Sequence, residues 1–160
     1  EFSPTLLCLI LAGKVGSNIA SEIGSMRVTE QIDALEILGV NSANFLILPK
    51  IIAAMFFFPF LVIISMGIGM LGGWLGSMSV DVTTADFLYG LRYEFRPFYV
   101  TYALTKTVVF AFIITSVASF YGYYTKGGAL EVGVSSTKAV VYSSVVVLIF
   151  NFILTQLLLA

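Results

Sequence analysis

The chain has 160 residues, of which 59% are hydrophobic and 11% are charged, and its formal net charge is −1. Soluble domains carry about 25% charged residues, so this composition excludes an ordinary soluble fold. The charge balance also gives no reason to expect a nucleic acid as partner. Histidine is absent and the single cysteine, Cys8, lies in an apolar run. We therefore expect no disulfide and no metal site, with Cys8 as a small packing residue.

Three stretches contain no charged residue: 51–80, 107–125 and 139–160. Each has about the 20 residues that a helix needs to cross a bilayer. Their apolar residues are continuous and do not alternate, which argues against the strands of a membrane β-barrel. The sequence predicts an all-α fold, a polytopic transmembrane bundle formed by a single domain, residues 1–160. Its membrane helices are expected at about 4–25, 47–80, 97–125 and 139–160.

The first predicted span, 4–25, has Pro4 in its first turn, a position that suits proline. Gly16, Ala20 and Gly24 repeat every four residues, a spacing that lets helices pack closely in membranes. Its two charges, Lys14 and Glu22, are expected to pair with other helices. The chain begins with neither methionine nor a signal peptide, and we expect a fragment that lacks N-terminal membrane segments.

The most polar segment, 27–39, is predicted to form a short helix with Thr29 as N-cap and Gly39 as its stop. At roughly 15 Å it is too short to span the membrane. Helical spacing separates an apolar side from an acidic one. The first contains Val28, Ile32 and Leu35, and the second Glu30, Asp33 and Glu36 or Ile37. Two interpretations remain open, a solvated loop helix and a handle that a soluble protein grips.

The uncharged stretch 51–80 is longer than one perpendicular crossing and contains Pro59. We expect either one long, tilted and kinked helix or a helix followed by a re-entrant piece. Gly69, Gly73 and Ser77 repeat every four residues, so a second close helix contact is expected there.

Aromatic residues are dense between 81 and 106, as is typical of a membrane surface. Thr83 is predicted to start a short interfacial helix, and Pro97 the next span. The helix is expected to turn four apolar residues toward lipid: Phe87, Leu88, Leu91 and Phe95.

Three basic residues of this region are candidates for binding lipid headgroups: Arg92, Arg96 and Lys106. Arg92 and Arg96 are alternatively interface anchors or contacts for a partner protein. Lys106, about ten residues inside its span, either meets a phosphate or extends its ammonium to the membrane surface.

A polar turn at 126–138 precedes the last span, and Ser135 or Ser136 is expected to cap the final helix. Gly128 and Gly133 imitate the start of a P-loop, but the obligatory Lys is missing and a glycine turn explains both residues. Five of the eight Lys and Arg residues lie in the 14–50 region and this turn, which predicts that both loops are cytoplasmic.

No nucleophile with a base, carboxylate pair or metal cluster stands out, so we predict no catalytic residue and no cofactor. Residues 24–36 read GSMRVTEQIDALE, which closely resembles the signature of the MlaE family of ABC-transporter permeases. AGKVGS at 12–17 and GGA at 127–129 look like the same family. So do VG at 132–133, STKAVV at 136–141 and SS at 143–144. The similarity thus touches nearly the whole chain.

This resemblance implies a homodimeric permease of the bacterial inner (cytoplasmic) membrane. It implies cytoplasmic ATPase subunits, which would hydrolyse ATP, and an MCE-type substrate-binding protein as partners. The expected cargo is phospholipid or a related lipid, moved between the inner and outer membranes. By match to the family, the ATPase contacts are Arg27, Glu30, Gln31, Asp33 and Glu36.

Two other functions remain open. One is a non-transporting membrane scaffold that docks a soluble partner through residues 27–39. The other is a secondary transporter, for which the sequence offers few intramembrane carboxylates to relay ions.

Overall fold

The computed structural model describes residues 2–80 and 82–159, so the predicted boundaries at 1, 81 and 160 lie outside the described residues. The described part is almost entirely helical and contains no strand. Four helices are long and apolar enough to cross a membrane: Phe2–Val28, Ser42–Val80, Pro97–Tyr123 and Ala129–Leu158. The predicted all-α, polytopic membrane fold is confirmed.

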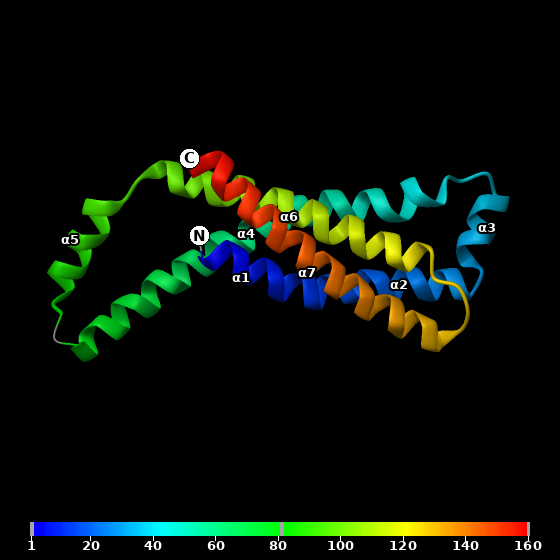
Figure 1. Ribbon diagram of the computed structural model, residues 1–160, viewed down its shortest axis with the longest axis horizontal. Coiled ribbons are helices and arrows are strands. Elements are labelled where there is room, and N and C mark those ends of the chain that lie inside the picture. Colours follow the sequence, from blue (N-terminus) through cyan, green and yellow to red (C-terminus); the bar gives the residue numbers. More distant parts are fainter. Residues whose placement is uncertain (1, 81, 160) are drawn as a thin grey trace.

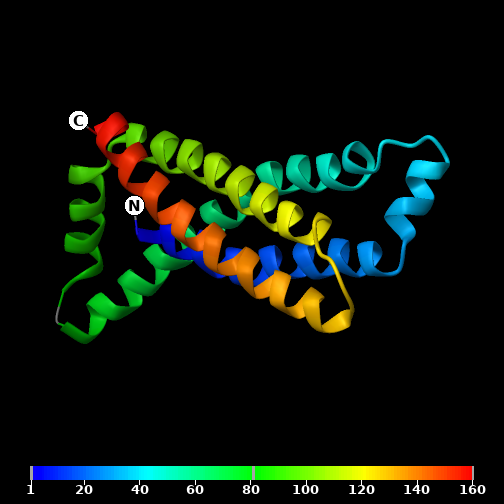
Figure 2. The same ribbon diagram turned by 45° about the vertical axis from the view of Figure 1, so that its right-hand side comes forward.

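The four spans run side by side along the long axis of the molecule (Figures 1 and 2). A short helix, α3, crosses one end of the bundle, and α5 crosses the opposite end. The elements are α1 (Phe2–Leu11), η1 (Ala12–Gly16), α2 (Ser17–Val28), α3 (Gln31–Ile37), α4 (Ser42–Ser77), η2 (Met78–Val80), α5 (Thr84–Glu94), α6 (Pro97–Tyr123) and α7 (Ala129–Leu159).

The first span is one continuous rod in which a π-helical turn, η1, joins α1 to α2. Its small-residue side is buried, as the four-residue spacing predicts, and α6 packs against it. A Cβ added at Gly122 of α6 would lie only 2.8 Å from the carbonyl oxygen of Ala20. Glu22 forms an ion pair with Lys50 at 2.7 Å, which links α2 to α4.

The long uncharged stretch lies in a single helix, α4, which includes both Pro49 and Pro59 and corresponds to the first of the two alternatives. The helix begins at Ser42, earlier than expected, because the Asn41 side chain caps it by accepting the Asn44 N–H at 3.1 Å. The close helix contact predicted at its glycine face is not formed within the described residues. A Cβ added at Gly69 would meet nothing within 4 Å, and one at Gly73 would meet only the Phe87 ring, at 3.7 Å, which is ordinary side-chain contact.

The last helix begins at Ala129, well before the predicted residue 139, so Ser135 and Ser136 are not its caps. Gly127, with φ +118°, turns the chain immediately before this start. The first turns of α7 are mostly exposed and carry Glu131 and Lys138, so the uncharged stretch of the sequence begins only after them. Ser136 instead donates to the Ser17 carbonyl oxygen at 3.0 Å and ties α7 to α2.

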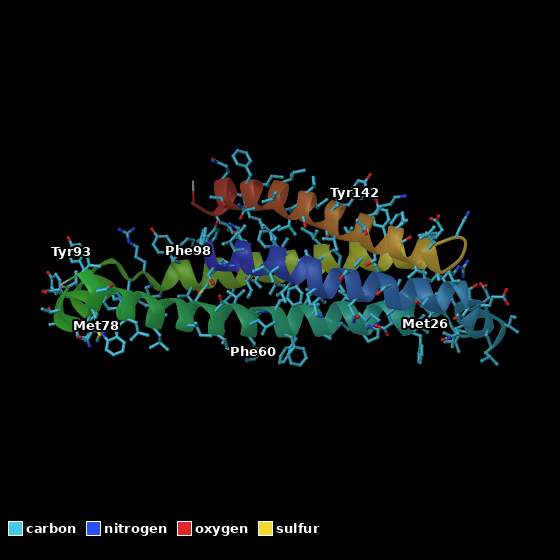
Figure 3. All side chains as sticks on the ribbon, turned by 90° about the horizontal axis from the view of Figure 1, so that it is seen from below. Met26, Phe60, Met78, Tyr93, Phe98 and Tyr142 are labelled. Carbon is cyan, nitrogen blue, oxygen red and sulfur yellow. The ribbon has the colours of Figure 1, made fainter. Side chains whose placement is uncertain are left out.

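The buried core runs along α6. In the apolar part of this helix 56% of the residues are buried, against 11% in α7 and 17% in the span that contains α4. Cys8 is a fully buried free thiol in this core, beside Phe58, Phe110 and Ile114. The outer surface is apolar, and Phe60 points away from the bundle on α4 (Figure 3). Such a surface suits lipid and not water.

Candidate functional site

The α3 end of the molecule carries the residues that the sequence singles out for coupling (Figure 1). Thr29 is not the N-cap of α3, since its hydroxyl donates back to the Ser25 carbonyl oxygen at 2.8 Å and terminates α2. Glu30 occupies the N-cap position with φ 60°, where the chain turns from α2 into α3. The predicted stop is confirmed: Gly39 has φ 77°, and N–H groups of Gly39 and Val40 bond the carbonyls of Glu36 and Leu35.

Ile32 anchors α3 to the bundle. Its side chain is fully buried in an apolar cluster to which α2, α6 and α7 contribute Ile19, Ala20, Ile23, Ala118 and Ala139. A seven-residue helix is too short to be stable alone in water, so this burial is what holds it in place.

Glu36 supplies a polar anchor on the same helix. Its Oε1 accepts hydrogen bonds from the Tyr123 hydroxyl of α6 and from the Ser42 hydroxyl of α4, both at 2.9 Å. The hydrogen bond from Tyr123, then that from Ser42 and the nearby charge of Arg27 outweigh desolvation and hold the pKa of this carboxyl below its ordinary value. Glu36 therefore stays ionised at neutral pH and connects α3 to two spans.

Arg27 closes the turn between α2 and α3. Its guanidinium donates to Asp33 Oδ1 at 2.8 Å and lies over the Tyr123 ring, 5.5 Å from the centroid. Both charged side chains are substantially exposed, so the pair adds little stability. The Arg27 guanidinium instead orients the Asp33 carboxylate and lies against the ring of Tyr123, whose hydroxyl bonds Glu36.

Glu30 and Gln31 are exposed, and their side chains make no hydrogen bond or ion pair to any residue within 2–80 and 82–159. Ile37 and Leu38 are 86% and 76% exposed at the other end of α3. The structure thus divides the five predicted coupling residues. Three of them, Arg27, Asp33 and Glu36, have partners within the chain, and the other two face outward.

No pattern in the sequence points to Tyr123 and Ser42, which hold Glu36. Tyr123 is 87 positions from Glu36, and no local pattern links two residues so far apart. Ser42 was overlooked because the next span was expected to start later. For Ile37 the sequence does indicate exposure, since this residue falls on the acidic side of the predicted helix.

The three basic candidates at the other end are not brought together. Lys106 is fully buried between α6 and α7, where its Nζ donates to the Tyr102 hydroxyl at 3.0 Å and to Thr155 Oγ1 at 3.1 Å. Its ammonium also lies 5.1 Å from the Tyr102 ring centroid and 5.9 Å from that of Phe110. Buried in this way, Lys106 is held by groups of the protein and does not extend its ammonium to the membrane surface, which was one of the two alternatives.

Arg92 is exposed in the last turn of α5, and Arg96 immediately precedes α6. Arg96 lines a cavity of about 580 Å³ between α4, α5 and α6, whereas Arg92 does not. Three of the four residues expected to face lipid, Phe87, Leu91 and Phe95, line this cavity instead, and Leu88 lines a second one between α4 and α5. Thr83 caps α5 as predicted, accepting the Asp86 N–H at 3.3 Å. Among the described residues no group of acidic, cysteine or histidine side chains could hold a metal.

A family model described as Permease MlaE matches residues 1–157. This range contains α3 and nearly the whole of the four spans. The chain belongs to the MlaE permease family. A relative from Rickettsia bellii, named a probable ABC transporter permease protein, is 44% identical over 98% of this chain and 61% of its own length.

Other relatives of this MlaE-family chain come from cyanobacteria and plants. A probable ABC transporter permease protein of Synechocystis sp. is 38% identical over 99% of this chain and 60% of its own length. The chloroplastic Arabidopsis thaliana protein named TRIGALACTOSYLDIACYLGLYCEROL 1 is 36% identical over 98% of this chain and 45% of its own length. The chain therefore spans about three fifths of the length of its bacterial relatives. It is a multi-pass membrane component of the permease type.

Proposed function

We propose that this chain is part of a permease subunit that moves phospholipid or a related lipid between the inner and outer membranes of a bacterium. A separate cytoplasmic ATPase supplies the energy. The name of the Arabidopsis thaliana relative refers to a galactosylated diacylglycerol, which supports a lipid as cargo. The likeness to the MlaE family supports three further partners: a second copy of the subunit, an MCE-type protein and phospholipid.

The observation that carries the proposal is the construction of α3. Glu30 and Gln31 are exposed, so a soluble partner could contact them. Ile32 and Glu36 attach the same helix to the membrane spans. A displacement of α3 by an ATPase would therefore move α6 through Tyr123. A rigid helix transmits such a displacement, and a flexible loop would absorb it.

At the other end, Arg96 and Lys106 are proposed as contacts for the lipid headgroup, and Arg92, which does not line the cavity, as an interface anchor. Lys106 is fully buried, so a headgroup reaches it only when α6 and α7 separate during the transport cycle. Lipid photocrosslinking that is unchanged in Lys106→Ala would contradict this contact.

The coupling role is tested in proteoliposomes that contain the full-length permease with its ATPase. Glu30→Lys combined with Asp33→Lys places positive charge on the exposed side of α3. We expect normal membrane insertion and a loss of ATP-dependent lipid transfer of at least about tenfold, because like or unmatched charges at an interface weaken docking. Glu131→Lys is the matched control, since Glu131 is exposed at the same end of the molecule but on α7.

The same experiment separates the proposal from its main rival. A non-transporting scaffold predicts that the wild-type complex shows no ATP-dependent transfer at all, although the double variant still loses its soluble partner. Wild-type transfer rates in the double variant would contradict the coupling role of α3.

A further inference from the structure

We infer that the cavity between α4, α5 and α6 binds a zwitterionic phospholipid, with its phosphate at Arg96 and its headgroup cation at Asp86. This inference rests on the proposed lipid cargo and narrows it to a headgroup class. It concerns a site at the α5 end of the molecule, away from the coupling helix (Figure 1).

The cavity has the size and chemistry of a binding site for an amphipathic molecule. Its volume of about 580 Å³ lies within the range of roughly 300–1,000 Å³ that is typical of small-molecule sites. Most of its lining is apolar, including Met66 of α4, Leu91 of α5 and Val100 of α6. These residues would accommodate an acyl chain and would repel water.

A neighbouring cavity extends the apolar space beside α5. A second cavity of about 400 Å³ lies between α4 and α5, and its lining shares Phe87 and Leu91 with the first. Phe87 also approaches Gly73 of α4, where an added Cβ would lie 3.7 Å from its ring. Two apolar side chains therefore form the wall of α5 against which a lipid chain would pack.

Two opposite charges flank the apolar lining of the larger cavity. Asp86 lies in the first turn of α5, and Arg96 follows the end of the same helix. The Arg96 side chain makes no hydrogen bond or ion pair to any part of the chain that the structure describes. Asp86 uses Oδ2 to accept the Thr83 hydroxyl, which leaves Oδ1 available.

The direction of α5 relates these charges to the membrane. The helix crosses the long axis of the bundle (Figures 1 and 2), so Asp86 and Arg96 follow one another roughly parallel to the membrane surface. Tyr99 lines the same cavity, and Tyr93 lies at this end (Figure 3), as expected at headgroup depth.

A headgroup with two opposite charges matches this arrangement. The planar guanidinium of Arg96 suits a phosphate, which it can bind through two parallel hydrogen bonds. Asp86 attracts an ammonium group, as in phosphatidylethanolamine, whereas phosphatidylglycerol offers it only hydroxyl groups and carries an uncompensated negative charge that the carboxylate repels. The pair thus favours a zwitterionic lipid over an anionic one.

Trp74, the only tryptophan in the sequence, reports on this site. It lines the smaller cavity, and its Nε1 donates to Thr84 Oγ1 of α5 at 3.3 Å. Brominated acyl chains quench nearby tryptophan fluorescence. The full-length permease is placed in phosphatidylglycerol vesicles containing about one tenth brominated phosphatidylethanolamine or brominated phosphatidylglycerol, and Trp74→Phe supplies the background to subtract.

We expect brominated phosphatidylethanolamine to bind about two- to fivefold more strongly than brominated phosphatidylglycerol, the preference that one exposed ion pair supports. Asp86→Asn, whose amide oxygen can still accept the Thr83 hydroxyl, should abolish this preference, and Asp86→Glu should restore it. Arg96→Gln should weaken both lipids. Arg92→Gln is the matched control, because it removes the same charge from the same region outside the cavity.

Equal quenching by both lipids in the wild type, or a preference that survives Asp86→Asn, would overturn the inference. So would an Arg92→Gln variant that behaves like Arg96→Gln. Absence of quenching by either lipid would mean that protein fills the cavity, which also overturns it.

The same vesicles, supplied with the ATPase and ATP, test the proposed function separately. ATP-driven transfer without a headgroup preference at Trp74 would leave the proposed function standing and remove the inference. Preferential quenching without any ATP-driven transfer would support the binding site and contradict the proposed transport function.

Discussion

At Gly122 the backbones of α2 and α6 come close enough that no side chain fits between them. An added Cβ would lie 2.8 Å from the carbonyl oxygen of Ala20 and 3.0 Å from Cβ of Ile23. Neither atom belongs to a flexible side-chain end that could move aside. Because lipid tails are as apolar as the helices, close packing of this kind is a main source of helix association in a membrane.

We therefore expect Gly122→Ala to lower the free energy of unfolding by about 1–3 kcal/mol, the usual cost of overpacking. A lower thermal unfolding midpoint in detergent would reveal it. Gly133→Ala is the matched control, since Gly133 lies within α7 and an added Cβ there meets nothing within 4 Å. Identical midpoints for the two variants would contradict the close approach.

Lys106 illustrates what a single residue's pattern can and cannot predict. A charged side chain inside an apolar stretch is costly to bury in a membrane, so the sequence predicts that polar groups of the protein surround it. The compensation comes from Tyr102, one turn away, and from Thr155, 49 positions away on α7. Only the folded bundle brings that second hydroxyl to the ammonium.

Among the elements, α3 depends most visibly on the rest of the molecule. Seven residues form it, and the sequence predicts both its existence and its stop at Gly39. The start was placed at the wrong residue, because Thr29 fits an N-cap by type yet serves as the last residue of the preceding turn. A cap is decided by the path of the chain, which local preferences do not contain.

Gly39→Ala tests the stop of α3. The φ of 77° disfavours any residue with a Cβ by roughly 1–2 kcal/mol, so this end of the helix should loosen. We expect faster hydrogen exchange of the α3 amides and weaker ATP-dependent transfer. Gly67→Ala is the control, because an added Cβ there has open space and the backbone is helical. Unchanged exchange in Gly39→Ala would argue against a strained stop.

At the scale of the whole molecule, the two ends are chemically different. The α3 end carries acidic and ion-paired residues, and the α6–α7 turn lies at the same end (Figure 1). The α5 end carries aromatic residues and the cavity that contains Asp86 and Arg96. This division fits the function proposed above, in which the protein is driven from one side of the membrane and handles lipid on the other.

Cysteine labelling in oriented vesicles tests this arrangement. In a Cys8→Ser background, Gln31→Cys and Lys126→Cys should react with a membrane-impermeant maleimide from one side, and Tyr93→Cys from the other. All three positions are exposed. Val147→Cys, at a fully buried position, should remain unlabelled. Labelling of positions 31 and 126 from opposite sides would contradict the fold.

The sequence by itself determined the membrane class, the four spans and the short helix with its glycine stop. These follow from the hydrophobicity of consecutive residues and from local backbone preferences. The tertiary structure decided which side chains of α3 face outward, which hydroxyls hold Glu36 and Lys106, and how Asp86 and Arg96 come to share a cavity. The pairings of Tyr123 with Glu36 and of Thr155 with Lys106 join residues far apart in the chain, and the geometry of all these contacts exists only after the helices have packed.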